Sequence, residues 1–188
     1  MPHAFILYGP IETGKTRTCL YLLERAREAG VEASGVLSPR VFSEGKLQGY
    51  DCLNAATSER FPLVRLSVNV EGPGWFQHAG LMFSFSVPGF KHANEILLDS
   101  AGKMERSTLA FVDEFGRIER AGRGLYEGVK QICDALSNGG VVVITCRGDL
   151  IEAVEEMIRG SVEVIRVEPG NIENMWELIW SALAEDLK

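Results

Sequence analysis

Long apolar runs are missing from this sequence. No segment approaches the roughly 20 apolar residues that a helix needs to cross a bilayer. Met1-Pro2-His3 leads into the first apolar stretch without the charged and then apolar pattern of a secretion signal. We therefore expect a cytoplasmic protein that neither crosses nor binds a membrane.

Cysteine and histidine are scarce, and neither is grouped. The four cysteines at positions 19, 52, 133 and 146 form no C-x-x-C pair, so we expect free buried thiols in place of disulfides or a metal site. The three histidines, His3, His78 and His92, are too scattered for a metal-ligand or catalytic-triad arrangement.

Positive charge is not in excess either. The chain has 19 lysines and arginines against 26 aspartates and glutamates, which gives a formal net charge of −7. An extended nucleic-acid surface needs many clustered basic groups, so we expect none, whereas a single nucleotide needs only a local positive site. With 188 residues, 46% of them apolar and 24% charged, we predict one globular domain over 1–188. The sequence leaves open whether the protein has a protein partner.

What the sequence does contain is a phosphate-binding pattern, G-x-x-x-x-G-K-[ST]. Its residues are Gly9, Pro10, Ile11, Glu12, Thr13, Gly14, Lys15 and Thr16. An apolar run at 4–8 precedes this phosphate loop, and an apolar stripe at helical spacing follows it. Strand, loop and helix in this order let the backbone curl around phosphate oxygens and let the helix N-terminus face the anion. A glycine turn that caps an ordinary helix is the weaker alternative.

The side chains of this loop have separate predicted roles. Lys15 supplies positive charge for the terminal phosphates, and the Thr16 hydroxyl supplies a ligand for Mg²⁺. Arg17, the next residue, is included in the predicted nucleotide site. Glu12 brings a carboxylate into a loop that attracts anions, so we expect it to point outward, toward solvent or a basic partner.

A second motif follows a buried strand. Residues 108–112 form an apolar run of the kind found in strands buried on both faces, and the run ends in Asp113-Glu114. Beside a phosphate loop, such an Asp holds the water shell of Mg²⁺, and the next acid can orient or deprotonate a water that attacks the γ-phosphate. A strand that simply ends in solvent is the alternative. Thr145, after the apolar run 141–144, is expected at the same sheet edge, either as a sensor of the γ-phosphate or as an ordinary strand residue.

Strands alternate with helical patterns along the chain, which predicts an α/β fold with a mostly parallel sheet between two helical layers. The P-loop NTPase fold has this three-layer arrangement, with ligands at the carboxyl ends of the strands. An antiparallel hairpin is inserted, because apolar stretches at 41–42 and 47–53 flank a polar loop. Further strands are expected at about 33–38, 62–66 and 162–167, the last near an edge, and helices at about 15–30, 88–106, 125–136, 150–158 and 171–183.

Aromatic residues cluster in two places. Residues 70–90 are broken by glycine and proline but carry much aromatic area, and we expect them to pack over the sheet because such clusters are usually core. A flap whose rings cover the base or ribose of a nucleotide is the alternative. Trp176 and Trp180, on the last helix, are expected to be core anchors.

The chain resembles the small P-loop nucleoside triphosphatases, the family that includes the cancer-related nucleoside-triphosphatase. The resemblance lies in the phosphate loop, in residues 35–40 and 49–50, in the run 113–119 and in Thr145. It implies hydrolysis of ATP, GTP and other nucleoside triphosphates to the diphosphate, with Mg²⁺ as cofactor and loose selectivity for the base. The chain departs from the family at Glu12, where Gly is usual, and at Cys146-Arg147, where Ile-Pro is usual.

Together, the motifs and the resemblance predict in-line attack of water on the γ-phosphorus. Glu114 would position the water, and Lys15 and Mg²⁺ would stabilise charge on the phosphate oxygens. Three arginines are candidates for contact with the transition state: Arg40, Arg117 and Arg147. Two other classes stay open, a kinase for a nucleotide or another small molecule and a regulatory module that binds nucleotide with slow turnover.

Overall fold

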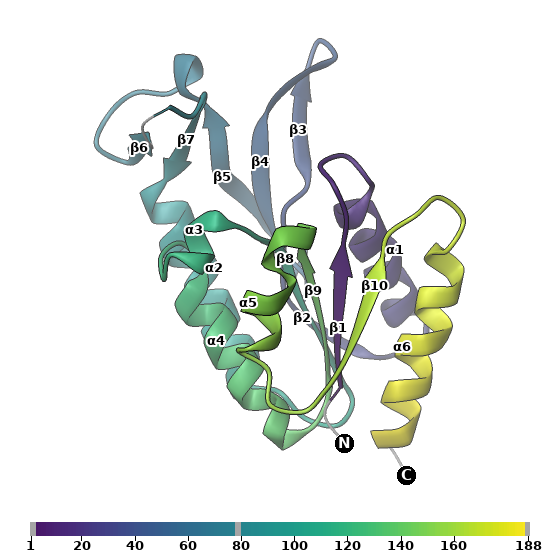
Figure 1. Ribbon diagram of the computed structural model, residues 1–188. Coiled ribbons are helices and arrows are strands. Elements are labelled where there is room, and N and C mark those ends of the chain that lie inside the picture. Colours follow the sequence, from purple (N-terminus) through teal and green to yellow (C-terminus); the bar gives the residue numbers. More distant parts are fainter. Residues whose placement is uncertain (1–2, 78–79, 187–188) are drawn as a thin grey trace.

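Residues 3–77 and 80–186 are described by the computed structural model, so Met1, Pro2 and His78 among the residues discussed above lie outside it. The strands form one ten-stranded sheet in the order β10-β1-β9-β8-β2-β4-β5-β7-β6, with β3 beside β4 off this path (Figure 1). The strands are β1 (His3–Tyr8), β2 (Glu32–Leu37), β3 (Arg40–Ser43), β4 (Lys46–Asn54), β5 (Arg60–Leu66), β6 (Trp75–Gln77), β7 (Phe83–Ser86), β8 (Thr108–Phe115), β9 (Val141–Cys146) and β10 (Ser161–Arg166). The helices are α1 (Lys15–Glu28), α2 (Val87–Gly102), α3 (Arg117–Arg120), α4 (Tyr126–Ala135), α5 (Ile151–Glu155) and α6 (Ile172–Asp186).

One half of the sheet is parallel, as the sequence predicts. It consists of β10, β1, β9, β8 and β2. All residues of β9 are buried, and so are those of β8 except Glu114. Strands that helices cover on both faces read as continuous apolar runs. The carboxyl ends of the parallel strands meet at one edge of the sheet, at the top of Figure 1.

Helices cover both faces of this sheet, which confirms the predicted three layers. Helices α1 and α6 lie on one face, and α2, α4 and α5 lie on the other (Figure 1). Strand β1 contributes to both cores with the period of two that a strand imposes. Ala4 and Ile6 join the core beneath α2 and α4, whereas Phe5 and Leu7 join the core beneath α1 and α6.

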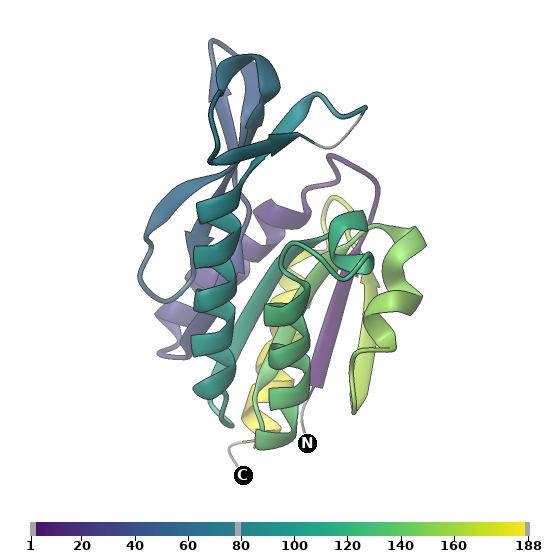
Figure 2. The ribbon, with the colours of Figure 1, turned by 90° about the vertical axis from the view of Figure 1, so that its left-hand side faces the viewer.

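The inserted antiparallel part is larger than the predicted hairpin. Strands β3 and β4 form that hairpin, but β5, β7 and β6 continue the sheet beyond β4 through further antiparallel pairs. Most of the insert stands above the carboxyl edge of the parallel strands, while the end of β4 lies beside β2 (Figures 1 and 2). Strands β6 and β7 have three and four residues. This length is too short to show the alternation of apolar and polar residues that predicts a strand, so pairing with neighbouring strands stabilises them more than their own sequence does.

The described residues of 70–90 therefore include β6, β7 and the start of α2. Phe85 is buried, and Phe76 stacks on it with ring centroids 5.3 Å apart. The Ser86 hydroxyl accepts the Gly89 N–H at 3.1 Å and caps α2, with Pro88 in the first turn. Phe85 thus packs as expected, whereas Phe76 is 42% exposed and β6 and β7 extend the edge of the sheet and do not lie over it.

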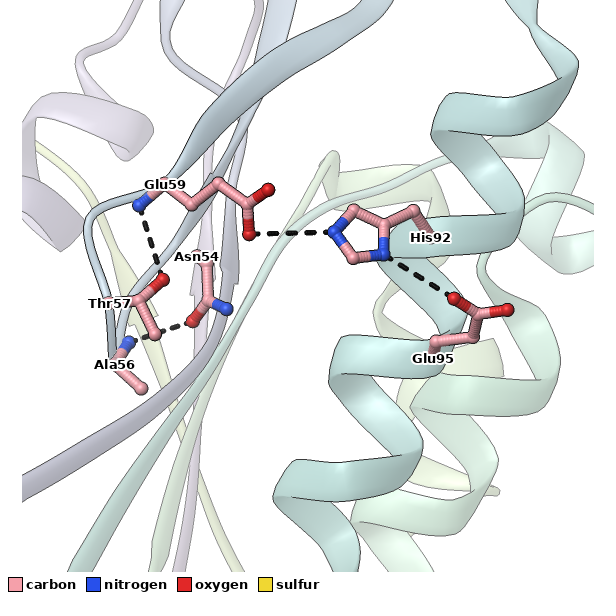
Figure 3. Close-up of polar contacts among 6 residues, drawn as sticks. All are labelled: Asn54, Ala56, Thr57, Glu59, His92 and Glu95. Atoms are coloured by element: carbon pink, nitrogen blue, oxygen red, sulfur yellow. Dashed lines mark hydrogen bonds and ion pairs between the residues drawn. The ribbon is translucent and has the colours of Figure 1, made fainter.

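The lower end of the insert is attached to α2. In the turn between β4 and β5, Asn54 Oδ1 accepts the Ala56 N–H at 3.0 Å and Thr57 Oγ1 accepts the Glu59 N–H at 3.2 Å (Figure 3). Glu59 then meets His92 of α2 at 3.5 Å, and Glu95 lies 3.4 Å from the other ring nitrogen. These polar contacts join two segments that are distant in the sequence.

Some predicted boundaries and burial states need correction. Strand β8 continues through Asp113-Glu114-Phe115, and a register shift lets Phe115 pair with Cys146, so the two acids lie within an irregular strand end and not after the strand. The expectation that Trp180 is a core anchor is wrong, because Trp180 is 38% exposed and stacks on the buried Trp176 from outside.

Other expectations hold. The cysteines at 19, 52, 133 and 146 are free and buried. Across residues 3–77 and 80–186, no helix combines the length and the apolar character that crossing a membrane requires.

Gly35 in β2 gives a test of the close contact between β2 and β8. Its φ is +90°, and a Cβ at this position would collide with the backbone of Phe111 in β8. Its N–H donates to Ser100 Oγ of α2 at 3.0 Å. We expect Gly35→Ala to lower the free energy of unfolding by about 3 kcal/mol or more, from strained φ and overpacking together, as measured by urea unfolding.

The matched control is Gly102→Ala at the end of α2. A Cβ there meets no atom within 4 Å, so we expect a change between zero and a gain of about 1 kcal/mol. Equal stabilities for the two variants would contradict the close approach of β2 to β8.

Candidate active site

The phosphate loop joins β1 to α1, as predicted. Gly14 is the N-cap of α1 with φ +92°, contributes no side-chain cap, and no acidic residue lies in the first turn. The N-terminal end of this 14-residue helix is therefore suited to an anion. Lys15 is buried, and its ammonium donates to the carbonyls of Gly9 and Pro10, each at 2.9 Å. Its charge is thus held against the loop.

Glu12 points outward, as expected, and its basic partner is in the same chain. Arg40 Nη1 donates to Glu12 Oε1 at 3.1 Å. The backbone of Glu12 has φ +70°, a conformation that glycine adopts more easily. The ion pair joins the phosphate loop to the first residue of β3, so the insert contacts this loop directly.

Asp113 is the most enclosed acid of the site, with an exposed fraction of 0%. Its Oδ1 accepts the Thr145 hydroxyl at 2.6 Å, and its Oδ2 accepts the Ser38 N–H at 3.0 Å. Thr145 Oγ1 also accepts the Glu114 N–H at 2.8 Å. Thr145 therefore holds Asp113 and the peptide of Glu114 in place and is itself fully buried.

Glu114 faces a different environment from Asp113. Its φ is +72°, and it is the exposed residue of an otherwise buried strand. A non-glycine residue at positive φ is strained, and such strain tends to lie at functional sites. The turn of the backbone directs this carboxylate toward the phosphate loop.

Two adjoining hollows, of about 300 and 310 Å³, lie between the loop and the sheet edge. We call them together the phosphate hollow. Glu12, Lys15, Arg40 and Glu114 line both parts. Further predicted residues that line one part are Ile11, Thr13, Gly14, Thr16, Arg17, Arg117 and Arg147.

Not every predicted site residue lines the phosphate hollow. Gly9, Pro10, Asp113 and Thr145 are not among the lining residues, and Asp113 lines a separate cavity on the other side of Glu114. Asp113 and Thr145 act from behind the hollow through their hydrogen bonds. Arg147 is engaged by Asp149, with Nη2 and Oδ2 2.6 Å apart and a second contact from Nε at 3.1 Å.

Glu119 is an important residue that the motif analysis missed. It is buried, and its carboxylate accepts the N–H groups of Gly116 at 3.0 Å and Leu125 at 3.1 Å. Burial raises the pKa of Glu119, and these N–H groups oppose the shift. The two bonds close the loop that follows Glu114. An acid three residues after the N-cap Gly116 is the signal that could have identified it.

The donors present fit a magnesium ion held mainly by a nucleotide. Among the described residues, no three His, Cys, Asp or Glu side chains form a metal-binding group. Thr16 offers a half-buried hydroxyl, and the Asp113 carboxylate keeps two lone-pair positions beyond its two hydrogen bonds. Magnesium commonly takes few protein oxygens and completes its shell with phosphate and water.

The titration of Glu114 follows from its surroundings. Although the residue is exposed within the hollow, protein on several sides removes hydration from the carboxylate. That loss and the neighbouring charge of Asp113 raise the pKa of Glu114 to about 7, while Lys15 and Arg40 act in the opposite direction. Near neutral pH the group can take up or release a proton.

A pH-dependent stability follows. Because the folded pKa of Glu114 is above its unfolded value, this group stabilises the fold at low pH and loses that contribution as pH rises from about 4.5 to about 7. We expect Glu114→Gln, measured without nucleotide at pH 8, to have a free energy of unfolding about 1 kcal/mol higher than the wild type, after discounting for solvent screening. Denaturant unfolding measures this difference. At pH 4 the two proteins should match. A gain of equal size at both pH values would contradict this explanation.

Comparison with known proteins gives relatives along nearly the whole chain. The nucleoside-triphosphatase THEP1 of Korarchaeum cryptofilum is 23% identical over 189 residues, which cover 98% of this chain and 88% of that protein. The protein of the same name from Methanopyrus kandleri is 26% identical over 124 residues, covering 62% of this chain and 67% of the relative.

Two solved structures share the fold. The solution structure of a human cancer-related nucleoside triphosphatase superposes with a TM-score of 0.71 at 21% identity and covers 98% of both chains. The crystal structure of THEP1 from the hyperthermophile Aquifex aeolicus has a TM-score of 0.67 at 20% identity, over 94% of this chain and 98% of that one. A family model described as NTPase matches residues 4–180, and the chain therefore belongs to this NTPase family.

Proposed function

We propose that this protein hydrolyses nucleoside 5'-triphosphates, ATP and GTP among them, to the diphosphate and phosphate with Mg²⁺. The observation that carries the proposal is the position of Glu114, which shares the phosphate hollow with Lys15 and the phosphate loop. A loop that binds phosphate and an acid that can accept a proton are thus brought to one place. The relatives named nucleoside-triphosphatase support the same activity.

In this proposal, the phosphate loop binds and orients the triphosphate. The N–H groups at the start of α1 face the phosphates, and the Lys15 ammonium exchanges its loop carbonyls for phosphate oxygens. Thr16 and Asp113 are the residues that would hold Mg²⁺, Asp113 through water. When bound, Mg²⁺ neutralises part of the charge on the phosphate oxygens.

Glu114 acts on the attacking water. The water oxygen forms a bond to the γ-phosphorus while the bond from that phosphorus to the β–γ bridging oxygen breaks. The water proton passes to the Glu114 carboxylate, and the diphosphate leaves with the bridging electron pair. Thr145 keeps the Glu114 peptide in position through its hydrogen bond of 2.8 Å.

Arg40 is the arginine best placed to neutralise charge at the γ-phosphate. It lines both parts of the phosphate hollow, whereas Arg117 and Arg147 line one part, and Arg147 is paired with Asp149. Its pair with Glu12 is exposed, and exposed ion pairs contribute little stability. A phosphate can therefore compete with Glu12 for this guanidinium at small cost.

Other features of the proposal concern the chain as a whole. We propose that residues 1–188 work as one domain, which the continuous sheet supports. The free buried thiols support a reducing compartment such as the cytoplasm. The acidic net charge of −7 supports a nucleotide, and not an extended nucleic acid, as the phosphate-bearing ligand.

Glu114→Gln tests the catalytic acid. We expect it to bind MgATP as tightly as the wild type but to release phosphate at least about 100-fold more slowly, because the amide cannot take up the water proton. Phosphate release is measured over ATP, GTP, CTP and UTP at saturating concentration. Glu177→Gln, an exposed change on α6, should keep full activity. Normal hydrolysis by Glu114→Gln would remove this residue from the mechanism.

Lys15→Ala tests the phosphate loop. The variant loses a charge-assisted contact with the terminal phosphates, so we expect nucleotide affinity to fall at least about tenfold in a calorimetric titration. Lys46→Ala, at the exposed first residue of β4, removes the same charge elsewhere and should bind like the wild type. Equal affinity of the two variants would contradict the assignment of the loop.

A further inference from the structure

A second cavity lies on the other side of Glu114 from the phosphate loop. It has a volume of about 250 Å³, and its wall is rich in aromatic rings: Tyr50, Phe83, Phe85 and Phe90. We call it the aromatic cavity. Residues of the phosphate loop are not among its lining residues, whereas Asp113 and Glu114 are. Arg117 and Glu119 line it as well, so a few charged groups stand among mainly apolar residues.

The aromatic cavity adjoins the phosphate hollow. Tyr50, Glu114, Gly116 and Arg117 line both spaces. Glu114 lines all three hollows described here. A γ-phosphate bound beside Lys15 and Glu114 would therefore lie at the opening between the two spaces.

The aromatic wall is held in place by the inserted strands. Phe83 and Phe85 come from β7, Tyr50 from β4 and Phe90 from α2. Tyr50 meets Phe83 edge to face with ring centroids 6.0 Å apart, and Phe85 meets Phe90 at 5.9 Å. On its other side Phe85 is supported by the stacked ring of Phe76. Rings ordered in this way present fixed faces to a flat partner.

The aromatic cavity is half open to the surface, so it is a pocket and not an enclosed packing void. Small-molecule sites are concave, mostly apolar and aromatic, and carry a few polar groups in fixed places. The aromatic cavity has this character, because hydrogen bonds hold the carboxylates of Asp113 and Glu119 in its wall.

We propose that the aromatic cavity is the acceptor site of a phosphoryl-transfer activity and that it takes a nucleoside. The base would lie against the ring faces of Phe83 and Phe85, and a hydroxyl group of the sugar would reach Glu114. This inference rests on the proposed function, because it needs the γ-phosphate at the opening between the two spaces. An uncharged acceptor fits better than an anion, since the cavity is lined by three acids, Asp113, Glu114 and Glu119, against the single cation Arg117.

The transfer step uses the same groups as hydrolysis. The acceptor oxygen forms a bond to the γ-phosphorus, and the bond from that phosphorus to the β–γ bridging oxygen breaks. The hydroxyl proton passes to the Glu114 carboxylate, and the diphosphate leaves with the bridging electron pair. Glu114 then releases the proton to solvent. The nucleoside becomes its monophosphate, and water attacks when the cavity holds no acceptor.

The experiment follows the label from γ-³²P-ATP with Mg²⁺ in the presence of adenosine, guanosine, cytidine, uridine or thymidine. Labelled nucleoside monophosphate and labelled free phosphate are separated, and the amount of each is measured in the same reaction. We expect at least one nucleoside to become labelled, and the free phosphate to fall as that nucleoside is added.

Phe83→Ala and Phe42→Ala form a matched pair of variants. Phe83 lines the aromatic cavity, while Phe42 is an exposed ring on β3 outside it. We expect kcat/KM for the nucleoside to fall about tenfold in Phe83→Ala through loss of one aromatic face and to stay unchanged in Phe42→Ala. Phosphate release without nucleoside should stay within about twofold in both variants. If Phe83→Ala does not fold, Phe83→Leu, which keeps an apolar side chain but removes the aromatic ring, is compared with Phe42→Ala in its place.

The outcomes separate this inference from the proposed function. Free phosphate without any labelled monophosphate would overturn the acceptor site and leave hydrolysis standing. Labelled monophosphate formed equally by Phe83→Ala and Phe42→Ala would overturn the assignment to this cavity. Monophosphate without phosphate release in the absence of nucleoside would support the acceptor site and contradict the hydrolase proposal. Absence of both products would overturn both proposals.

Discussion

The buried carboxylate of Asp113 is the constraint on which the site depends. It joins three neighbouring strands at their carboxyl ends, since it accepts the N–H of Ser38 just after β2 and the hydroxyl of Thr145 in β9. An enclosed carboxylate that lost either partner would leave a polar group unsatisfied, at a cost of about 1–3 kcal/mol or more. The strand ends are thereby kept in register, and the edge of the sheet becomes a rigid base for the phosphate loop.

This anchoring places the two acids of the motif in different surroundings. Asp113 uses its oxygens inside the sheet, and Thr145 accepts the next N–H, so Glu114 leaves the strand direction with φ +72°. Its carboxylate enters a hollow that also contains Lys15 and Arg40. Burial and the charge of Asp113 raise the pKa of Glu114 to about 7, near the pH at which a general base is most useful.

The insert adds a second space beside the carboxyl edge of the sheet. In an open α/β sheet the ligand site lies at the carboxyl ends of the strands, and here the inserted strands stand over that edge (Figure 2). Arg40 reaches the phosphate loop through Glu12, and Tyr50 forms part of the wall between the two spaces. The edge that carries the phosphate loop thus has two adjoining spaces, and Glu114 lines both.

The phosphate loop, the acid pair Asp113-Glu114 and the buried parallel strands could be predicted from the sequence, because each depends on residues close together in the chain. The partners of Asp113, which lie 75 and 32 residues away, and the partner of Glu12 could be found only in the folded structure. The folded structure also decided that Trp180 faces solvent and that β5 to β7 extend the sheet. Short strands and single polar contacts are stabilised by distant neighbours and not by local propensity, so no local pattern predicts them.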